Sequence, residues 1–159
     1  MTFNHDLAKK LIKPWQLRLW MLTKLPMGLV SGMKVVSLTE EGCQVVLKDK
    51  WWIRNPFGSV FWAVMGMAAE LSTGALVYAY ASGSDVRFIL VGMEAKFFKK
   101  AKGKSYYFCD TGLDVLRAIQ ELKKSDESSL VILPVIAKDQ TGEPLASFSF
   151  QWQLRKPIN

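Results

Sequence analysis

The sequence predicts an α+β domain in which one curved antiparallel sheet wraps around a long buried helix. The first observation is an apolar stretch from Val60 to Ala81 that contains no proline. The second is that strand-like segments outnumber helical ones, and the third is the alternation of apolar and polar residues in the last of them. Short turns join most of these strands, so a single sheet packed on the long helix is the most economical arrangement.

The apolar stretch predicts a helix of about five turns, since Ala, Met, Leu and Trp dominate it. Pro56 suits the first turn of this helix, and Asn55 or Ser59 is placed to cap its free N–H groups. The helix is apolar on every side, so we expect it to be surrounded by protein or by lipid. A membrane span is disfavoured because Glu70 falls at its midpoint and no second span follows.

Residues 5–25 precede this core and have the pattern of a basic amphipathic helix. Pro14 is expected to kink it or to divide it into two helices. Its apolar stripe consists of Leu7, Leu11, Trp15, Leu19 and Leu22. We expect this stripe to pack on the domain; the alternative is a helix that lies on a membrane, with Trp15 and Trp20 at the interface.

A hairpin is predicted before the long helix, and four strands with one further helix after it. The hairpin strands are 33–39 and 43–48, joined by a turn at 40–42. The later strands are expected at 88–98, 105–109, 130–137 and 145–154, the helix at 113–123, and loops at 82–85, 99–104, 125–129 and 139–143. The last strand predicts one covered and one polar face, because its aromatic residues alternate with Ser and Gln.

The composition indicates one folded domain over residues 1–159, with a helical extension (1–32) before the core (33–155). Of the 159 residues, 50% are hydrophobic and 12% aromatic, which excludes a disordered chain. Cys43 and Cys109 lie inside predicted strands without metal-ligand spacing. We therefore expect reduced core cysteines in a cytoplasmic protein, an expectation that the absence of a secretory signal supports.

The formal net charge is +7. An excess of this size favours anionic partners, such as nucleic acid, acidic lipid or a phosphorylated small molecule. The alternative is that the charge serves only solubility.

Few catalytic motifs are present. There is no glycine-rich phosphate loop and no His/Cys metal spacing, so we expect no metal site. His5 is the only histidine and lies near the start of the chain, which disfavours a histidine-based triad. Glu70 remains as a candidate general base or nucleophile, because an apolar helix desolvates its charged form. The alternative is a structural carboxylate bonded to a core Tyr, Ser or backbone N–H.

The motif Asn55-x-x-Gly58, followed by an apolar helix with a carboxylate fifteen residues after the asparagine, resembles the hotdog-fold thioesterases. Those related to the phenylacetate-pathway enzyme are most similar. The stretch 97–103 is also similar to the strand end Tyr-Leu-Arg-Pro-Ala-x-x-Gly of that family, and the strand order agrees. The resemblance covers about residues 33–155, and is strongest to an uncharacterised branch in which Asn-Pro precedes Gly-Ser and Glu replaces the usual Asp.

The resemblance implies a homodimer, or a tetramer of two dimers, with active sites at the interface between subunits. Glu70 would act as general base or nucleophile on an acyl-CoA thioester, and Asn55 would orient substrate or water. A backbone N–H near Trp62 would polarise the thioester carbonyl. Coenzyme A would be part of the substrate and not a cofactor. We expect no nucleic-acid partner and no stable membrane insertion.

Further substrate-binding positions follow from the same resemblance. Gly58, Phe61 and Trp62 stand at the start of the helix. In the basic turn, Lys99, Lys100 and Lys102 are expected to pair with the phosphates of coenzyme A, the alternative being a solvated turn.

The sequence departs from the family at two places. Phe61-Trp62-Ala63 replaces His-Gly-Gly, and Leu90 falls near the position at which some members carry a helper Ser or Thr. The alternative function is therefore a non-catalytic hotdog protein that binds a fatty acyl chain or acyl-CoA. A third interpretation is an interfacial membrane protein led by residues 5–25.

Overall fold

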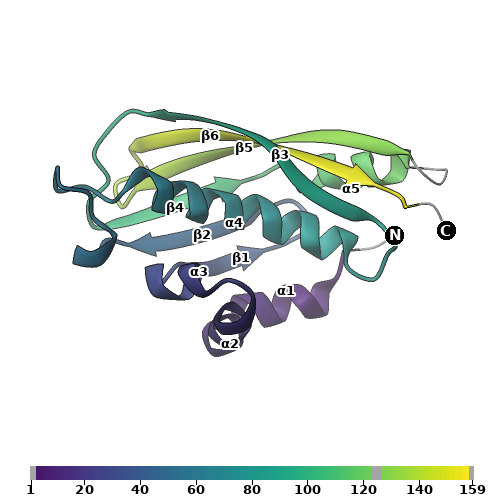
Figure 1. Cartoon of the computed structure of the whole chain (residues 1–159), viewed down its shortest axis with the longest axis horizontal. Coiled ribbons are helices and arrows are strands. Elements are labelled where there is room, and N and C mark those ends of the chain that lie inside the picture. The colour runs from purple at the N-terminus through teal and green to yellow at the C-terminus, as the bar shows by residue number, and fades with distance from the viewer. Residues whose placement is uncertain (1–2, 123–126, 158–159) are drawn as a thin grey trace.

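The computed structural model describes residues 3–122 and 127–157. At its centre lies α4 (Trp62–Ala81), and a six-stranded antiparallel sheet of order β1-β2-β4-β5-β6-β3 curves around it (Figure 1). The strands are β1 (Lys34–Leu38), β2 (Cys43–Lys48), β3 (Arg87–Phe97), β4 (Lys104–Cys109), β5 (Ser128–Asp139) and β6 (Pro144–Arg155). This arrangement is the expected hotdog fold, with the helix on the concave face of the sheet.

The strand predictions are confirmed to within one or two residues at nearly every end. The alternation in β6 also has its expected consequence, because Phe148, Phe150, Trp152 and Leu154 are buried under α4. Cys43 and Cys109 lie opposite each other in the β2–β4 pairing, and both are buried free thiols. The predicted helix at 113–123 is α5 (Gly112–Glu121). Its predicted last residue and the loop residues 125–126 lie outside the described residues.

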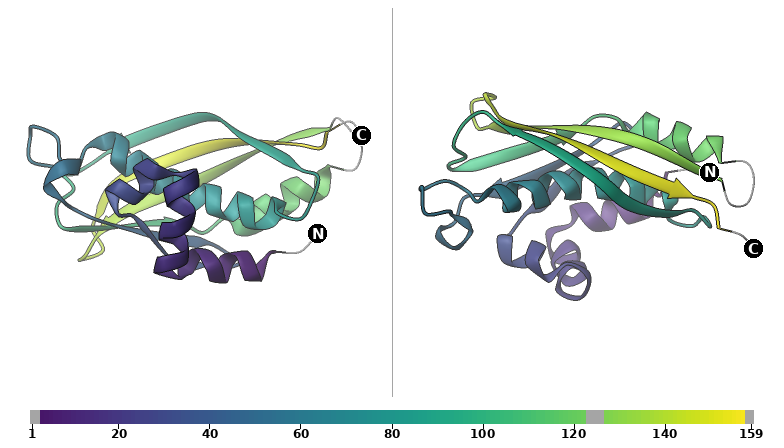
Figure 2. Two further views of the ribbon diagram at one scale, coloured as in Figure 1. Left: turned by 60° about the horizontal axis from the view of Figure 1, so that its bottom comes forward. Right: turned by 45° about the horizontal axis from the view of Figure 1, so that its top comes forward.

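Three helices precede the sheet: α1 (His5–Ile12), α2 (Pro14–Lys24) and α3 (Pro26–Ser31). They lie beside β1 and across α4, on the side away from the body of the sheet (Figure 2). Asn4 caps α1, since its Oδ1 accepts a hydrogen bond of 2.9 Å from the N–H of Leu7. Pro14 divides the segment into two helices, one of the two outcomes expected from the sequence. Within the described ranges, no helix is long and apolar enough to cross a bilayer.

The predicted burial of one continuous apolar stripe is wrong for α2. Leu11 of α1 is buried, but Trp15, Leu19 and Leu22 are exposed, and α2 packs on the domain with Leu17 and Met21 instead. The chain leaves the helical conformation at Lys13 (φ −73°, ψ 117°). The break changes the direction of the axis, so the spacing of apolar residues in α1 does not continue into α2.

The predicted start of the long helix is also wrong. Pro56 lies in a turn six residues before α4, which begins at Trp62 with Phe61 as its N-cap residue. Neither Asn55 nor Ser59 caps the helix, because no side chain donates or accepts a cap hydrogen bond there. A short 3₁₀ helix, η1 (Trp51–Ile53), leads into this turn.

Candidate active site

The helix α4 is not surrounded on every side, contrary to the prediction. One row of residues, spaced four apart, remains partly or largely exposed; it consists of Trp62, Gly66, Glu70, Gly74 and Tyr78. Residues spaced by four are neighbours on a helix, but each such step turns the row by about 40°. The row is therefore an inclined strip that winds across the helix, with the Glu70 carboxyl near its middle.

Glu70 lines an apolar cavity of about 300 Å³ between α4, the N-terminal helices and the sheet. Phe88 and Trp152 form the sheet side, while Trp20, Lys24 and Leu25 come from the N-terminal helices. The Trp152 indole is fixed, because its Nε1 donates a 3.0 Å hydrogen bond to the hydroxyl of Thr73 on α4. The cavity thus brings the carboxylate to the edge of an apolar space that could hold an aliphatic chain.

Gly74 provides the room for this carboxylate. A Cβ at position 74 would lie 3.0 Å from Glu70 Oε1 and 3.5 Å from the Trp152 ring. A side chain at position 74 would therefore shift the Glu70 carboxyl by a few tenths of an ångström, whereas its distance to the Trp152 ring is an ordinary van der Waals contact.

The Glu70 carboxyl has no hydrogen-bond or ion-pair partner among the residues that the structure describes; the Lys24 side chain lines the same cavity without pairing with it. The structural alternative, a carboxylate bonded to a core Tyr, Ser or backbone N–H, is not found. Burial raises the pKa of Glu70 above its ordinary value. A carboxylate with a raised pKa is a stronger proton acceptor than an ordinary glutamate, as general-base catalysis requires.

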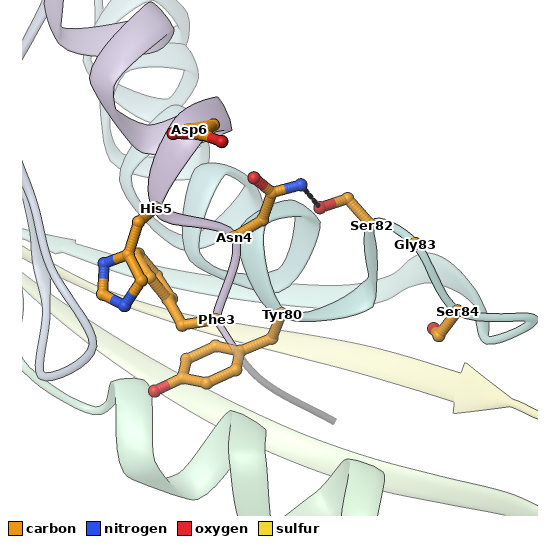
Figure 3. Close-up of a pocket in the computed structure, with 8 residues that line it drawn as sticks. All are labelled: Phe3, Asn4, His5, Asp6, Tyr80, Ser82, Gly83 and Ser84. Atoms are coloured by element: carbon orange, nitrogen blue, oxygen red, sulfur yellow. Dashed lines mark hydrogen bonds between the residues drawn. The ribbon is translucent and has the colours of Figure 1, made fainter.

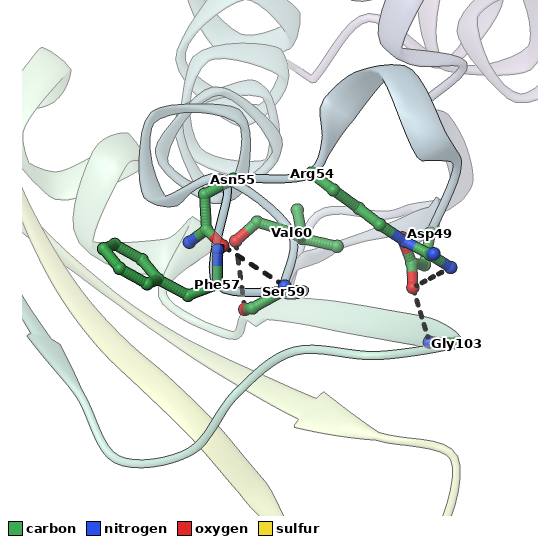
Figure 4. Close-up of polar contacts among 7 residues, drawn as sticks. All are labelled: Asp49, Arg54, Asn55, Phe57, Ser59, Val60 and Gly103. Carbon is green, nitrogen blue, oxygen red and sulfur yellow. Dashed lines mark hydrogen bonds and ion pairs between the residues drawn. The ribbon is translucent and has the colours of Figure 1, made fainter.

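Asn55 organises the turn before α4 (Figure 4). Its side-chain Oδ1 accepts hydrogen bonds from the N–H groups of Phe57 (3.0 Å) and Ser59 (3.2 Å). The turn is closed by the Asn55 N–H, which donates to the Ser59 carbonyl at 2.8 Å. Gly58 takes a φ of +73° in this turn, a conformation that glycine adopts without strain. The Nδ2 group of Asn55 is left as a donor toward solvent or a ligand.

A second cavity, of about 490 Å³, opens in front of this turn and the first residue of α4. The N–H groups of Trp62 and Ala63 have no hydrogen-bond partner in the described part of the chain. Such groups are the free donors of a helix start, and they carry the positive end of the helix dipole. Asn55, Trp62, Lys99 and Lys100 all line this cavity.

The three predicted lysines differ in their surroundings. Lys99 forms ion pairs with Glu143 and, at 3.5 Å, with Asp139. Lys100 donates a 3.2 Å hydrogen bond to the carbonyl of Phe57. Lys102 is exposed, with no hydrogen bond or ion pair among the described residues. The charge of Lys99 is therefore largely neutralised, whereas those of Lys100 and Lys102 remain open to an anion.

The predicted site residues fall into two groups within one chain. Trp62 and Glu70 are eight residues apart on α4, a distance of about 12 Å along the helix axis. Asn55, Trp62 and the lysines lie at one cavity, and Glu70 lies at the other. Phe61 and Trp62 stack edge to face at 5.6 Å, with exposed rings at the start of the helix.

A further cavity of about 490 Å³ lies at the opposite end of α4, where the chain enters α1 (Figure 3). His5 Nε2 lies 3.1 Å from Glu40 Oε1 there. The hydroxyls of Ser82 and Ser84 instead bond to backbone carbonyls at the end of α4, and Asn4 donates to Ser82 at 3.0 Å. These contacts fasten the N-terminal segment to α4, and they leave no hydroxyl directed at His5.

The residues from the N-terminal helices were not predicted at the site. Trp20, Lys24 and Leu25 reach Glu70 only through the fold, since about 45 to 50 positions separate them in sequence. The sequence offered only a weak signal here, since α2 carries two tryptophans, Trp15 and Trp20, and nothing in their spacing to Glu70 indicates which of them reaches the site. No group of His, Cys, Asp and Glu side chains with metal-binding geometry occurs in residues 3–122 and 127–157.

Comparisons with known proteins identify the fold and a family. The family model described as a domain of unknown function (DUF4442) matches residues 14–154. A protein of unknown function from Pseudomonas aeruginosa, named a probable thioesterase, superposes with a TM-score of 0.75 at 21% identity, over 98% of this chain and 97% of that one. A thioesterase from Haemophilus influenzae gives a TM-score of 0.69 at 10% identity, over 96% and 97%. None of the curated proteins matches the sequence.

A protein of unknown function from Chlorobaculum tepidum superposes with a TM-score of 0.77 at 13% identity, over 97% of both chains. At these identities the likeness establishes the hotdog fold. All three structures match nearly the whole chain, so the N-terminal helices are part of the shared architecture.

The raised pKa of Glu70 predicts a pH-dependent stability. The folded protein retains the Glu70 proton at pH values at which the unfolded chain has lost it, so the free energy of unfolding falls as pH rises from the ordinary glutamate pKa through the raised one. Glu70→Gln cannot ionise. At neutral pH we expect this variant to be at least as stable as the parent in urea unfolding, and the advantage to disappear below the ordinary glutamate pKa.

Asp85→Asn is the matched control, since Asp85 is an exposed loop carboxylate. It should leave the pH profile of the parent unchanged. A Glu70→Gln variant that is destabilised equally at every pH would identify Glu70 as a structural carboxylate.

Proposed function

Because the chain belongs to the family described as a domain of unknown function (DUF4442) and has the fold of a thioesterase-like hotdog protein, we propose that it hydrolyses an acyl thioester, with an acyl-CoA as the substrate. The observation that carries this proposal is the unpartnered, half-buried Glu70 carboxyl at the edge of an apolar cavity.

The acyl chain would occupy the Glu70 cavity, where Phe88 and Trp152 provide apolar walls. Glu70 would accept a proton from water while the water oxygen attacks the thioester carbonyl carbon. The carbon–sulfur bond would then break, and the proton would pass from Glu70 to the leaving thiolate. The products are a carboxylic acid and free coenzyme A.

The free N–H groups at the start of α4 would stabilise the negative charge that develops on the carbonyl oxygen. This requires the Asn55 cavity and Glu70 to act on one substrate, although they lie at separate cavities within one chain. We therefore propose a homodimer in which one subunit supplies Glu70 and the other supplies the helix start.

The edge strand β3 is the proposed contact between the two subunits. It ends the sheet and is eleven residues long, with exposed Ile89, Val91 and Met93. An uncovered strand edge of this length readily pairs with a second strand. In an antiparallel pair of identical strands the two-fold axis is perpendicular to the sheet, so both α4 helices would lie on the same face.

A second candidate function is the binding of an acyl chain or acyl-CoA without hydrolysis. The observation that favours it is the exposed Phe61–Trp62 pair at the helix start, where Trp62 lines the cavity that the thioester would enter. Tight binding of acyl-CoA with no release of thiol would support this function over hydrolysis.

Glu70→Gln is expected to abolish most thioester hydrolysis. Gln has nearly the same shape but cannot accept the proton, so turnover of acyl-CoA should fall by about 100-fold or more while binding remains. Release of free thiol, measured with a thiol-trapping reagent over a panel of acyl-CoA chain lengths, gives the rate. Unchanged hydrolysis by Glu70→Gln would show that the assignment of Glu70 is wrong.

Two variants of Asn55 separate its role as a hydrogen-bond acceptor in the turn from its proposed role as a donor to substrate or water. Asn55→Asp keeps the Oδ1 acceptor for the Phe57 and Ser59 N–H groups but removes the Nδ2 donor. It should preserve stability and reduce turnover by a smaller factor than Glu70→Gln. Asn55→Ala loses both roles, so it should also lower the melting temperature.

Charge removal at the basic turn is expected to act on coenzyme A specifically. The double variant Lys100→Ala/Lys102→Ala should raise the KM for acyl-CoA by roughly 10-fold, since each lysine would lose a charge-assisted contact to phosphate. An acyl-pantetheine substrate lacks the nucleotide phosphates, and its KM should remain unchanged. Lys99→Ala is the control and should have a smaller effect, because Lys99 is already paired with carboxylates. Equal effects on both substrates would exclude contact between these lysines and the nucleotide.

A further inference from the structure

The outer face of α2 is apolar and uncovered. Trp15, Leu19 and Leu22 are 65%, 60% and 59% exposed, and their spacing places them on one face of the helix. The opposite face packs on the domain through Leu17 and Met21. Single exposed apolar residues are ordinary, but three neighbours on one helix face form a patch that calls for a partner.

A basic pocket lies beside this face. Four cationic side chains line a cavity of about 210 Å³, the floor of which is apolar: Arg18, Lys34, Lys48 and Lys50. None of the four forms an ion pair with a carboxylate in residues 3–122 and 127–157. Burial and then the charges of the other three lower the pKa of Lys50. The pocket therefore concentrates positive charge that no acid of the described chain neutralises.

The position of Lys50 is fixed by its surroundings. Its ammonium group lies 5.0 Å from the centre of the Trp52 ring. It also occupies the space over Gly32, where a Cβ would come within 2.0 Å of Nζ. Gly32 has a φ of +75°, so this position favours glycine for two independent reasons. The fold thus holds the Lys50 ammonium in place within the pocket.

Arg18 joins the pocket to the apolar face. It lies three residues after Trp15 and four residues before Leu22, so its side chain borders the exposed apolar row of α2. The same residue lines the basic pocket. A partner that covers the row therefore also meets Arg18 at the rim of the basic pocket, so an occupant that is both apolar and anionic fits this surface.

We propose that α2 docks this protein on an anionic lipid surface, with Trp15, Leu19 and Leu22 in the interfacial layer and headgroup phosphates at the basic pocket. Tryptophan prefers the headgroup level of a bilayer, and basic residues beside an apolar helix face are typical of interfacial helices. Three apolar side chains contribute a weak hydrophobic attraction to the membrane, and four cations contribute a weak electrostatic one. Together they give reversible binding and not insertion.

A second copy of the chain fits the same surface less well. A symmetric contact through α2 would bring two sets of four unpaired cations against each other, and like charges across an interface oppose association. Nucleic acid would satisfy the cations but would leave Leu19 and Leu22 without an apolar partner. The proposal is independent of catalysis, because none of these residues lines the Glu70 cavity.

Co-sedimentation of the full chain with vesicles tests the proposal. The protein should bind vesicles of equal parts phosphatidylcholine and phosphatidylglycerol, should not bind phosphatidylcholine alone, and should be released by salt. The variant Trp15→Gln/Leu19→Gln/Leu22→Gln should lose binding, and Leu19→Gln alone should weaken it. Leu113→Gln, at an exposed apolar position on α5, is the control and should retain binding.

The contribution of the pocket is tested separately. Lys34→Gln/Lys48→Gln should weaken vesicle binding by about 10-fold or more, since each lysine near an anionic surface adds to the attraction. Lys138→Gln/Lys156→Gln removes the same charge elsewhere and should have little effect. Thermal unfolding of each variant should match the parent, because all the changed side chains are exposed except Lys156, which is partly exposed.

Four results would overturn the proposal. The first is no binding to phosphatidylglycerol vesicles at low salt. The second is an equal loss of vesicle binding in Lys34→Gln/Lys48→Gln and in Lys138→Gln/Lys156→Gln, which would show that binding depends only on the net charge of the protein. The third is a triple α2 variant that stays on vesicles but changes its association state in ultracentrifugation, which would make the face a contact between copies. The fourth is stabilisation by inorganic phosphate that depends on Lys34 and Lys48 without any vesicle binding, which would make the pocket a site for small anions.

Discussion

An ionisable carboxyl in apolar surroundings is the constraint around which the candidate site is built. Glu70 stands on the central helix of the fold, and no side chain or backbone group of the described residues compensates its charge. Gly74 leaves room for the carboxyl, and Trp152, held by Thr73, closes the space beside it. A group held this way costs stability when it ionises, because burial disfavours the charged form. Ionisable groups with pKa values shifted in this way are typical of functional sites.

Two faces of α2 have different surroundings. Trp20 and Lys24 face the Glu70 cavity, while Trp15, Leu19 and Leu22 face outward. If the proposed docking holds, the helix that borders the proposed acyl cavity would also contact lipid. Such an arrangement would suit a substrate with a long apolar chain, because that chain is poorly soluble in water.

The fold was predictable from the sequence because its signals are local. Alternation in β6 and the turn at 40–42 each depend on a few neighbouring residues, and both appear in the structure as expected. The start of α4 was missed because an Asn can cap a helix or close a turn with the same side-chain oxygen. Asn55 closes a turn. The stripe of α2 was missed because the break at Lys13 separates two helices whose apolar spacing appeared continuous.

The candidate site was only partly predictable. Glu70 was singled out because a single charge in a long apolar helix is a strong local signal, and its carboxyl has no partner among the described residues. Its cavity could not be predicted, because Trp20, Leu25 and Phe88 meet only through tertiary packing. The surroundings of the lysines could not be predicted for the same reason. The carboxylates that pair with Lys99 belong to Asp139 and Glu143, about forty positions further along the chain.

The central claim is that Glu70 of one subunit acts with the helix start of another, and a mixed dimer tests it most directly. One subunit carries Glu70→Gln. The other carries Trp62→Pro, which removes one of the free N–H groups; proline is tolerated at the first position of a helix, and the extended conformation of Phe61 (φ −64°, ψ 133°) suits the residue before it. Each variant alone should be nearly inactive. The purified mixed dimer should regain about half of the parental thioester turnover, because one of its two sites is intact. A mixed dimer as inactive as the two variant homodimers would contradict a shared site.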